Sequence, residues 1–172
     1  MVTRDLPLSS TMLWLANRFS HFGPYSRVFR LRRAAFVAAG ARIHPDAKIS
    51  GAVRLHHPNV DIGDSWIGPG AQLLPTHGAA IVIGDRCAIA PEVMLHCGSH
   101  DLGDSRCRAG TPVAAPIRIG DGTWVGARAT FLSGAAVGSG CMVAAGSVVV
   151  GQFGDNLMVA GVPARTIRRL QN

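Results

Sequence analysis

The sequence predicts an all-β repeat fold, in which short strands coil around one apolar column. Apolar residues return at every sixth position through six consecutive repeats, a spacing that fits neither an amphipathic helix nor a long alternating strand. The fourth residue after most of them is small. With 21 glycines and ten aromatic residues among 172, the core must consist of branched aliphatic side chains. The repeated positions are Ile119, Val125, Phe131, Val137, Val143 and Val149.

Residues 1–40 lack this repeat and predict an N-terminal helical cap, broken around Gly23 and Pro24. Apolar residues there follow helical spacing, so we expect their stripe to pack on the body and cover the open first coil. The stripe comprises Leu8, Met12, Leu15, Phe19 and Phe22.

Residues 41–160 carry the repeat and predict the coiled body. The phase of the last six repeats recurs upstream at Ile83, Ile89 and Leu95, while an earlier run is offset from it and misses at Asp61. Between Leu95 and Ile119 the repeat stops, and the polar residues at about 98–116 predict a protruding loop. Rigid scaffolds commonly carry chemistry on such loops.

Residues 161–172 contain three arginines and predict a short basic C-terminal helix. The net charge of +7 is terminal, because residues 1–42 hold seven Arg and one Asp. Basic residues form no continuous stripe with aromatics, which argues against nucleic acid, whereas weak contact with a membrane surface fits the Arg-rich N-terminus. Four cysteines without a C-x-x-C pair, and no recognisable secretory signal, predict a cytoplasmic protein.

The segments "IGDGTWVGARATFLSGAAVGSGCMVAAGSVVV" and "VAGVPAR" resemble the hexapeptide-repeat acyltransferases, closest in motif to the sugar and polysaccharide O-acetyltransferases. The resemblance implies a left-handed parallel β-helix that assembles as a homotrimer. It also implies that acetyl-CoA donates an acetyl group to a hydroxyl of a small molecule or glycan.

The same resemblance indicates the reacting groups. The "GSHD" at residues 98–101 matches the family's loop histidine, which makes His100 the general base, with Asp101 as a weaker candidate to orient it. Trp124 matches a tryptophan that lines the substrate site. Ala127 replaces the family's serine near the oxyanion, so only its backbone N–H remains as a donor. His77 lies where relatives carry an acceptor-binding asparagine.

Small residues and a basic tail predict the coenzyme A site. Small side chains let the pantetheine arm lie along the coil, and arginines suit its phosphates. The predicted cofactor-binding residues are Gly126, Ala144, Ala145, Gly146, Arg165, Arg168 and Arg169.

Three other functions remain open from the sequence. A zinc hydratase like the γ-carbonic anhydrases would need three imidazoles, for which His77, His96 and His100 are the available set. Serine acetyltransferase shares the closing "AGVPAR" but has a longer helical N-terminal domain. A non-catalytic trimeric scaffold would not need the "GSHD" loop. We favour the O-acetyltransferase and expect no metal; the residues do not identify the acceptor or the acyl chain length.

Overall fold

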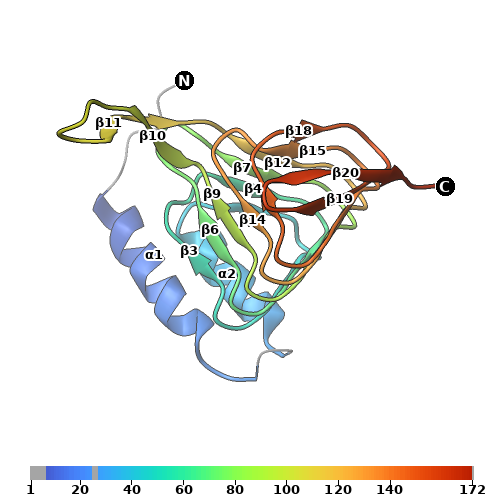
Figure 1. Ribbon diagram of the computed structural model, residues 1–172. Coiled ribbons are helices and arrows are strands. Elements are labelled where there is room, and N and C mark those ends of the chain that lie inside the picture. Colours follow the sequence, from blue (N-terminus) through green and yellow to red (C-terminus); the bar gives the residue numbers. More distant parts are fainter. Residues whose placement is uncertain (1–6, 25–26, 172) are drawn as a thin grey trace.

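The computed structural model describes residues 7–24 and 27–171, with side chains from residue 10 onward. Two helices, α1 (Pro7–Ser20) and α2 (Phe29–Ala38), precede a parallel β-helix whose three sheets run the length of the molecule (Figure 1). Each complete coil contributes one short strand to each sheet. The predicted parallel β-helix with an N-terminal helical segment is confirmed.

Sheet A contains β1 (Arg42–Ile43), β4 (Val60–Ile62), β7 (Ile81–Ile83), β12 (Ile117–Ile119), β15 (Ala136–Val137) and β18 (Gln152–Phe153). Sheet B contains β2 (Lys48–Ile49), β5 (Trp66–Ile67), β8 (Ala88–Ile89), β13 (Trp124–Val125), β16 (Met142–Val143), β19 (Leu157–Gly161) and β20 (Ala164–Arg169). Sheet C contains β3 (Arg54–Leu55), β6 (Gln72–Leu74), β9 (Met94–His96), β14 (Thr130–Phe131) and β17 (Val148–Val149). A separate hairpin, β10 (Gly98–Leu102) and β11 (Ala109–Ala114), leaves the coil after β9.

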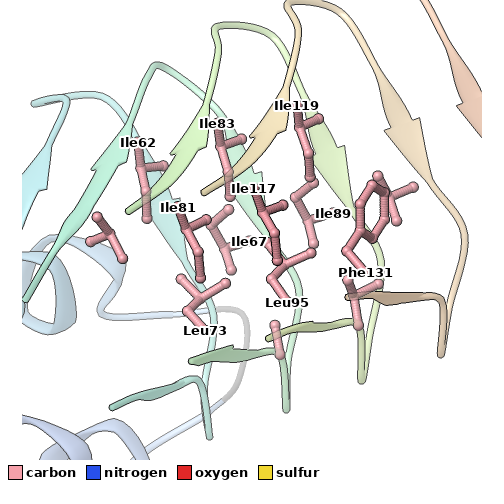
Figure 2. Packing of buried hydrophobic residues seen from close by; sticks show 14 of the residues in the cluster. Ile62, Ile67, Leu73, Ile81, Ile83, Ile89, Leu95, Ile117, Ile119 and Phe131 are labelled. Carbon is pink, nitrogen blue, oxygen red and sulfur yellow. The ribbon is translucent and has the colours of Figure 1, made fainter. Parts of the chain in front are cut away.

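The repeated apolar residues form the core. Like residues of successive coils stack, as Leu73, Leu95 and Phe131 do inside sheet C (Figure 2). Each is at most 2% exposed. Because strands of one sheet lie about 4.8 Å apart, stacked side chains remain in contact and bury a continuous column.

The miss at Asp61 in the early repeats has a local cause. In β4 the inward residues are Val60 and Ile62, so Asp61 points outward and the repeat misses there. The three-residue strands β7 and β12 likewise bury both ends, for example Ile81 and Ile83. Sheet A therefore takes a wider strand in the middle coils than the six-residue period predicts.

The "GD" turns connect the coils at the corner between sheets A and B. The Asp85 carboxylate accepts a hydrogen bond from the Asp64 N–H at 2.8 Å, and the Asp121 carboxylate accepts one from the Asp85 N–H at 3.0 Å. Asp155 accepts one from the Ser139 N–H at 2.7 Å. These aspartates thus satisfy the corner N–H groups that the turns leave unpaired.

Helix α1 covers the first coil through a face that the sequence did not predict. Leu13, Ala16 and Ser20 are the buried side chains, while the Met12, Leu15, Phe19 and Phe22 stripe is exposed. The expectation that this stripe packs on the body is therefore wrong; the side chain of Leu8 lies outside the described part. The face with Leu13, Ala16 and Ser20 therefore packs on the coil, and the bulky stripe lies on a neighbouring face of the helix and on the turn after it.

A buried arginine holds the turn between the helices. The Arg32 guanidinium donates to the carbonyl oxygens of Phe22 and Arg27, both at 2.7 Å, and of Pro24 at 3.1 Å. Burial lowers the pKa of Arg32 from its usual range. In the described residues, neither helix has the length and apolarity needed to cross a bilayer.

The predicted C-terminal helix is wrong, because Ala164–Arg169 form strand β20, antiparallel to β19. Strand β19 would otherwise be the edge of sheet B, with its N–H and C=O groups unpaired. Pairing with β20 satisfies those groups, which a helix of similar length could not do. The tail is basic as predicted, but its residues 164–169 form an extended strand.

Candidate active site

An open hollow of about 400 Å³ lies at the base of the hairpin, and we call it the hairpin hollow. Strand β10 leaves the coil directly after β9 and pairs with β11, which places His100 opposite Pro112. The "GSHD" segment is therefore held by a backbone ladder. The hollow is lined by Thr76, His96, Gly98, Ser99, His100, Pro112, Val113 and Ala114.

The imidazole of His100 is exposed at this hollow and forms no hydrogen bond within the described residues. Its neighbour Asp101 is exposed, and the strand register shifts between His100 and Leu102. No contact in the described chain joins the Asp101 carboxylate to the imidazole. A single chain thus presents His100 to solvent with both ring nitrogens available.

His77 lies beside the hairpin hollow rather than in it. Its ring meets that of His57 edge-on, with centroids 5.9 Å apart, and its backbone carbonyl lies 3.5 Å from the Asn59 side-chain nitrogen. Thr76, one residue earlier, lines the hollow instead. The turn before β7 therefore reaches the candidate site through Thr76.

A second hollow, of about 480 Å³, lies at the corner between sheets B and C, and we call it the corner hollow. It brings together three of the predicted cofactor and oxyanion residues from adjacent coils. The hollow is lined by Pro91, Glu92, Ala127, Arg128, Ala145 and Gly146. Small side chains at Ala145 and Gly146 leave this edge open.

Gly126 and Ala144 lie next to the corner hollow but do not line it. A Cβ on Gly126 would lie 2.5 Å from the Ala145 backbone nitrogen, so close stacking of the coils already requires glycine there. Gly146 has a φ of +69°, and its missing Cβ faces open space. Packing therefore explains Gly126, whereas Gly146 leaves room for a ligand.

Trp124 lies on the outer surface of sheet B and is 52% exposed. It pairs with Ala88 on one side and Met142 on the other. The same row continues through Met158 to Arg168. Because paired residues point to the same face, Arg168 shares the face of Trp124, three strand spacings or roughly 14 Å away.

The other two tail arginines are placed differently. Arg169 lies opposite Leu157, whose side chain packs against the core, and adjacent residues of a strand point to opposite faces. Arg165 donates to the carbonyl of its neighbour Ala164 at 2.8 Å. The strand therefore separates three cations that a helix would have gathered on one side.

The predicted site thus falls into two groups within one chain. His100 and the hairpin hollow follow the end of β9, while the corner hollow precedes its start. Sheet C lies between them, and its three-residue strand spans roughly 10 Å. Trp124 and the tail lie farther round, on sheet B.

Three residues at the hollows were not among the predicted site residues. His96 is exposed in the hairpin hollow, and its Nε2 atom lies 3.4 Å from the position of a Cβ on Gly98. Thr76 Oγ1 is buried without a partner among the described residues. Arg128 binds Glu92 at the corner hollow. The sequence carried only a weak signal for Thr76 and Arg128, because turns bring them to the hollows, and it indicated His96, at the end of β9, only as a possible zinc ligand.

Metal-ligating side chains do not gather in the described part of the chain, where no group of three or more His, Cys, Asp or Glu residues could hold an ion. All four cysteines are free, and three are buried. Burial raises the pKa of the Cys87 and Cys97 thiols.

Comparison with known proteins agrees with this architecture. A family model described as bacterial transferase hexapeptide (six repeats) matches residues 116–151. A hexapeptide-repeat acetyltransferase of Vibrio cholerae O1 biovar eltor, solved with acetyl coenzyme A, aligns with a TM-score of 0.83 at 24% identity, covering 99% of this chain and 91% of that one. Residues 116–151 therefore carry the hexapeptide repeat and the structural likeness shows the β-helix fold, which confirms the predicted resemblance to that family.

Curated relatives are named acetyltransferases. The galactoside O-acetyltransferase of Escherichia coli K12 is 33% identical over 92 residues, which are 54% of this chain and 45% of that protein. Serine acetyltransferase 4 of Arabidopsis thaliana is 35% identical over 128 residues, 74% of this chain and 29% of that protein. The chain spans about half the length of several of the curated relatives that it matches.

Proposed function

We propose that this protein is an acetyl-CoA-dependent O-acetyltransferase acting on a hydroxyl of a sugar or polysaccharide precursor. The observation that carries the proposal is His100, displayed on a rigid hairpin at an open hollow with both ring nitrogens free. The similarity of this chain to galactoside O-acetyltransferase over the β-helical body supports a sugar acceptor.

The chemistry assigns a role to each group. His100 accepts the hydroxyl proton as the acceptor oxygen attacks the thioester carbon, and imidazole basicity suits this transfer near neutral pH. The tetrahedral intermediate then collapses, the carbon–sulfur bond breaks, and the imidazolium returns the proton to the thiolate of coenzyme A. The Ala127 N–H donates to no backbone carbonyl in the described chain, which leaves it available to the oxyanion.

Coenzyme A would lie along the corner hollow and sheet B. Ala145 and Gly146 leave space for the pantetheine arm, with Ala144 beside them. Arg168, on the face of Trp124, is the best-placed of the tail arginines to meet a phosphate. The four free cysteines suit a reducing compartment, which supports a cytoplasmic location.

The separation of the two hollows supports a homotrimer. Neither hollow alone holds both the base and the cofactor groups. A neighbouring β-helix packed against sheet C would bring its corner hollow near His100 of the first chain. We therefore propose that each active site lies between two subunits, with His100 from one and the corner hollow from the next.

Replacement of His100 tests the reaction. His100→Ala should lower kcat by about two to four powers of ten with little change in acetyl-CoA affinity, because a general base acts mainly in the transition state. His21→Ala, an exposed histidine on the cap, is the matched control and should keep parental kcat. Steady-state kinetics over sugars, nucleotide sugars and serine would identify the acceptor. An unchanged kcat, or one zinc per purified subunit, would refute the proposal.

Subunit mixing tests the shared site. His100→Ala and Ala145→Trp, which fills the corner hollow, should each inactivate a homotrimer. Co-expressed with different affinity tags, they should regain activity, because roughly a quarter of randomly assembled interfaces pair an intact base with an intact hollow. If both groups belonged to one subunit, mixed trimers would stay inactive.

A further inference from the structure

The outer side of α1 and the turn that follows it carry large apolar side chains that remain exposed in the described chain. Trp14 is 62% exposed, and the stripe at Met12, Leu15, Phe19 and Phe22 is 39%, 53%, 37% and 62% exposed. Single exposed apolar residues are ordinary, but a contiguous group on one helix face marks an interaction site. We call Met12, Trp14, Leu15, Arg18, Phe19 and Phe22 the cap surface.

The cap surface is strongly cationic at its edges. Residues 7–45 contain no Asp or Glu, and the guanidinium groups of Arg18 and Arg27 are exposed without an ion-pair partner in the described chain. Arg30 and Arg33 line a hollow with Lys48, Asp46 and Asp64, so the two carboxylates partly offset the positive charge there. Arg32 is buried in the turn and does not contribute. Arg18 lies on α1 with the apolar residues, and the carbonyls of Arg27 and Phe22 accept hydrogen bonds from the same Arg32 guanidinium, so Arg18 and Arg27 add positive charge to this part of the cap.

The combination of exposed apolar side chains and positive charge indicates which kind of partner the cap surface binds. A second copy of the same surface would bring like charges together, which opposes association. The headgroup region of an anionic bilayer offers negative charge beside an apolar layer, and an arginine can keep its guanidinium among the phosphates while its stem lies along the apolar side chains. Helices that carry apolar side chains on one side and cationic side chains beside them lie in the plane of the membrane interface.

We propose that the cap surface binds the headgroup region of anionic lipid bilayers, so that the protein associates peripherally with membranes through α1. The inference rests on exposure and charge at the cap, and it stands independently of the acetyltransferase proposal. If both hold, the enzyme would meet acceptors presented at a membrane.

Vesicle sedimentation tests the proposal with the full chain. The protein should bind vesicles containing roughly one-third phosphatidylglycerol more tightly than vesicles of phosphatidylcholine alone, and the difference should shrink at high salt. Leu15→Ser with Phe22→Ser should reduce the partition coefficient at least about tenfold. Arg18→Glu with Arg27→Glu should reduce it about fivefold or more per arginine for the anionic vesicles.

Two matched controls carry equivalent changes elsewhere. Ile167→Ser removes an apolar residue of similar exposure from β20, and Arg118→Glu reverses an exposed charge on β12. Both should bind vesicles like the parent. Equal loss in the controls would mean that binding follows overall charge or hydrophobicity, and would overturn the assignment to the cap.

Trp14 provides a direct reporter. A Trp66→Phe, Trp124→Phe variant retains Trp14 as its one tryptophan, because the chain has three. Its emission should shift to shorter wavelength with anionic vesicles, since the indole leaves water. Absence of a shift, or equal affinity for neutral and anionic vesicles, would overturn the proposal. So would a change of oligomeric state in Leu15→Ser with Phe22→Ser, seen by light scattering, because the surface would then be a subunit interface.

Discussion

Both ends of the β-helix have an edge strand whose backbone groups need hydrogen-bond partners, and the two ends supply those partners in different ways. At the N-terminal end, the Asn17 side chain donates to the Leu55 carbonyl at 2.7 Å and accepts from the Leu55 N–H at 2.8 Å, replacing a strand partner for β3. At the C-terminal end, β20 continues the ladder of sheet B itself. Both ends are rich in arginine, yet a helix covers one edge and a strand covers the other (Figure 1).

The difference determines what each end presents to its surroundings. A helix uses one face to cover the coil and leaves the other free, so α1 displays its apolar stripe. A strand alternates its side chains, so β20 sends Arg168 and Arg169 to opposite faces. The same residue type therefore serves different purposes: Arg32 holds a turn, Arg18 lies on the cap surface, and Arg168 extends the row of Trp124.

The largest effect should come from the buried arginine of the N-terminal cap. Arg32→Met removes the donor shared by several carbonyls of the α1–α2 turn and should lower the free energy of unfolding by about 2–4 kcal/mol. Urea denaturation followed by circular dichroism measures it, with the exposed Arg30→Met as control. A change below the error of the control would show that the turn does not depend on Arg32.

Loss of the side chain that covers β3 should have the next largest effect. Asn17→Ala leaves the Leu55 N–H and C=O without partners and should destabilise the protein by roughly 1–3 kcal/mol. Thr11→Ala, at an exposed position of the same helix, should change stability little. Faster amide exchange at Leu55 in Asn17→Ala alone would locate the effect. Equal stability of both variants would contradict the edge-covering role.

Replacing the C-terminal arginines should change the KM for acetyl-CoA, whereas replacing an N-terminal arginine should not. Arg168→Ala should raise the acetyl-CoA KM several-fold while kcat at saturation stays near the parent, because a phosphate contact lies far from the reacting carbonyl. Arg169→Ala should have a smaller effect, and Arg18→Ala none. Acetyl-pantetheine, which lacks the nucleotide phosphates, should show no difference. If all three variants raise KM equally, the tail acts only through overall charge.

The smallest effect of a cap substitution should be on the labelling rates of the cysteine thiols in the β-helical body. Cys107 is exposed while Cys87, Cys97 and Cys141 are buried, so a thiol reagent should label one of the four rapidly in the native protein. Burial keeps the Cys87 and Cys97 thiols neutral, which further slows their reaction. Asn17→Ala should leave this pattern unchanged, because it loosens only the first coil. Rapid labelling of Cys87 in that variant would show that cap and body unfold together.

The sequence alone determined the body of this protein. A six-residue period of branched side chains admits few structures other than stacked coils, and the interruption after Leu95 marked the hairpin that carries His100. The prediction succeeded there because the same pattern of apolar and small residues recurs in successive repeats, so a departure in one coil does not hide the period. The N-terminal helices were also predictable from their spacing.

Only the tertiary structure decided the ends and the distribution of the site. Residues 164–169 suit a helix locally, but the unpaired edge of β19 makes the strand more stable. Likewise, helical spacing identified one stripe on α1, but the coil packs against a different face, which carries Leu13, Ala16 and Ser20. His100 follows the end of β9 whereas Ala127 precedes the start of β14, so the two lie at opposite edges of sheet C, a separation that residue type alone does not indicate.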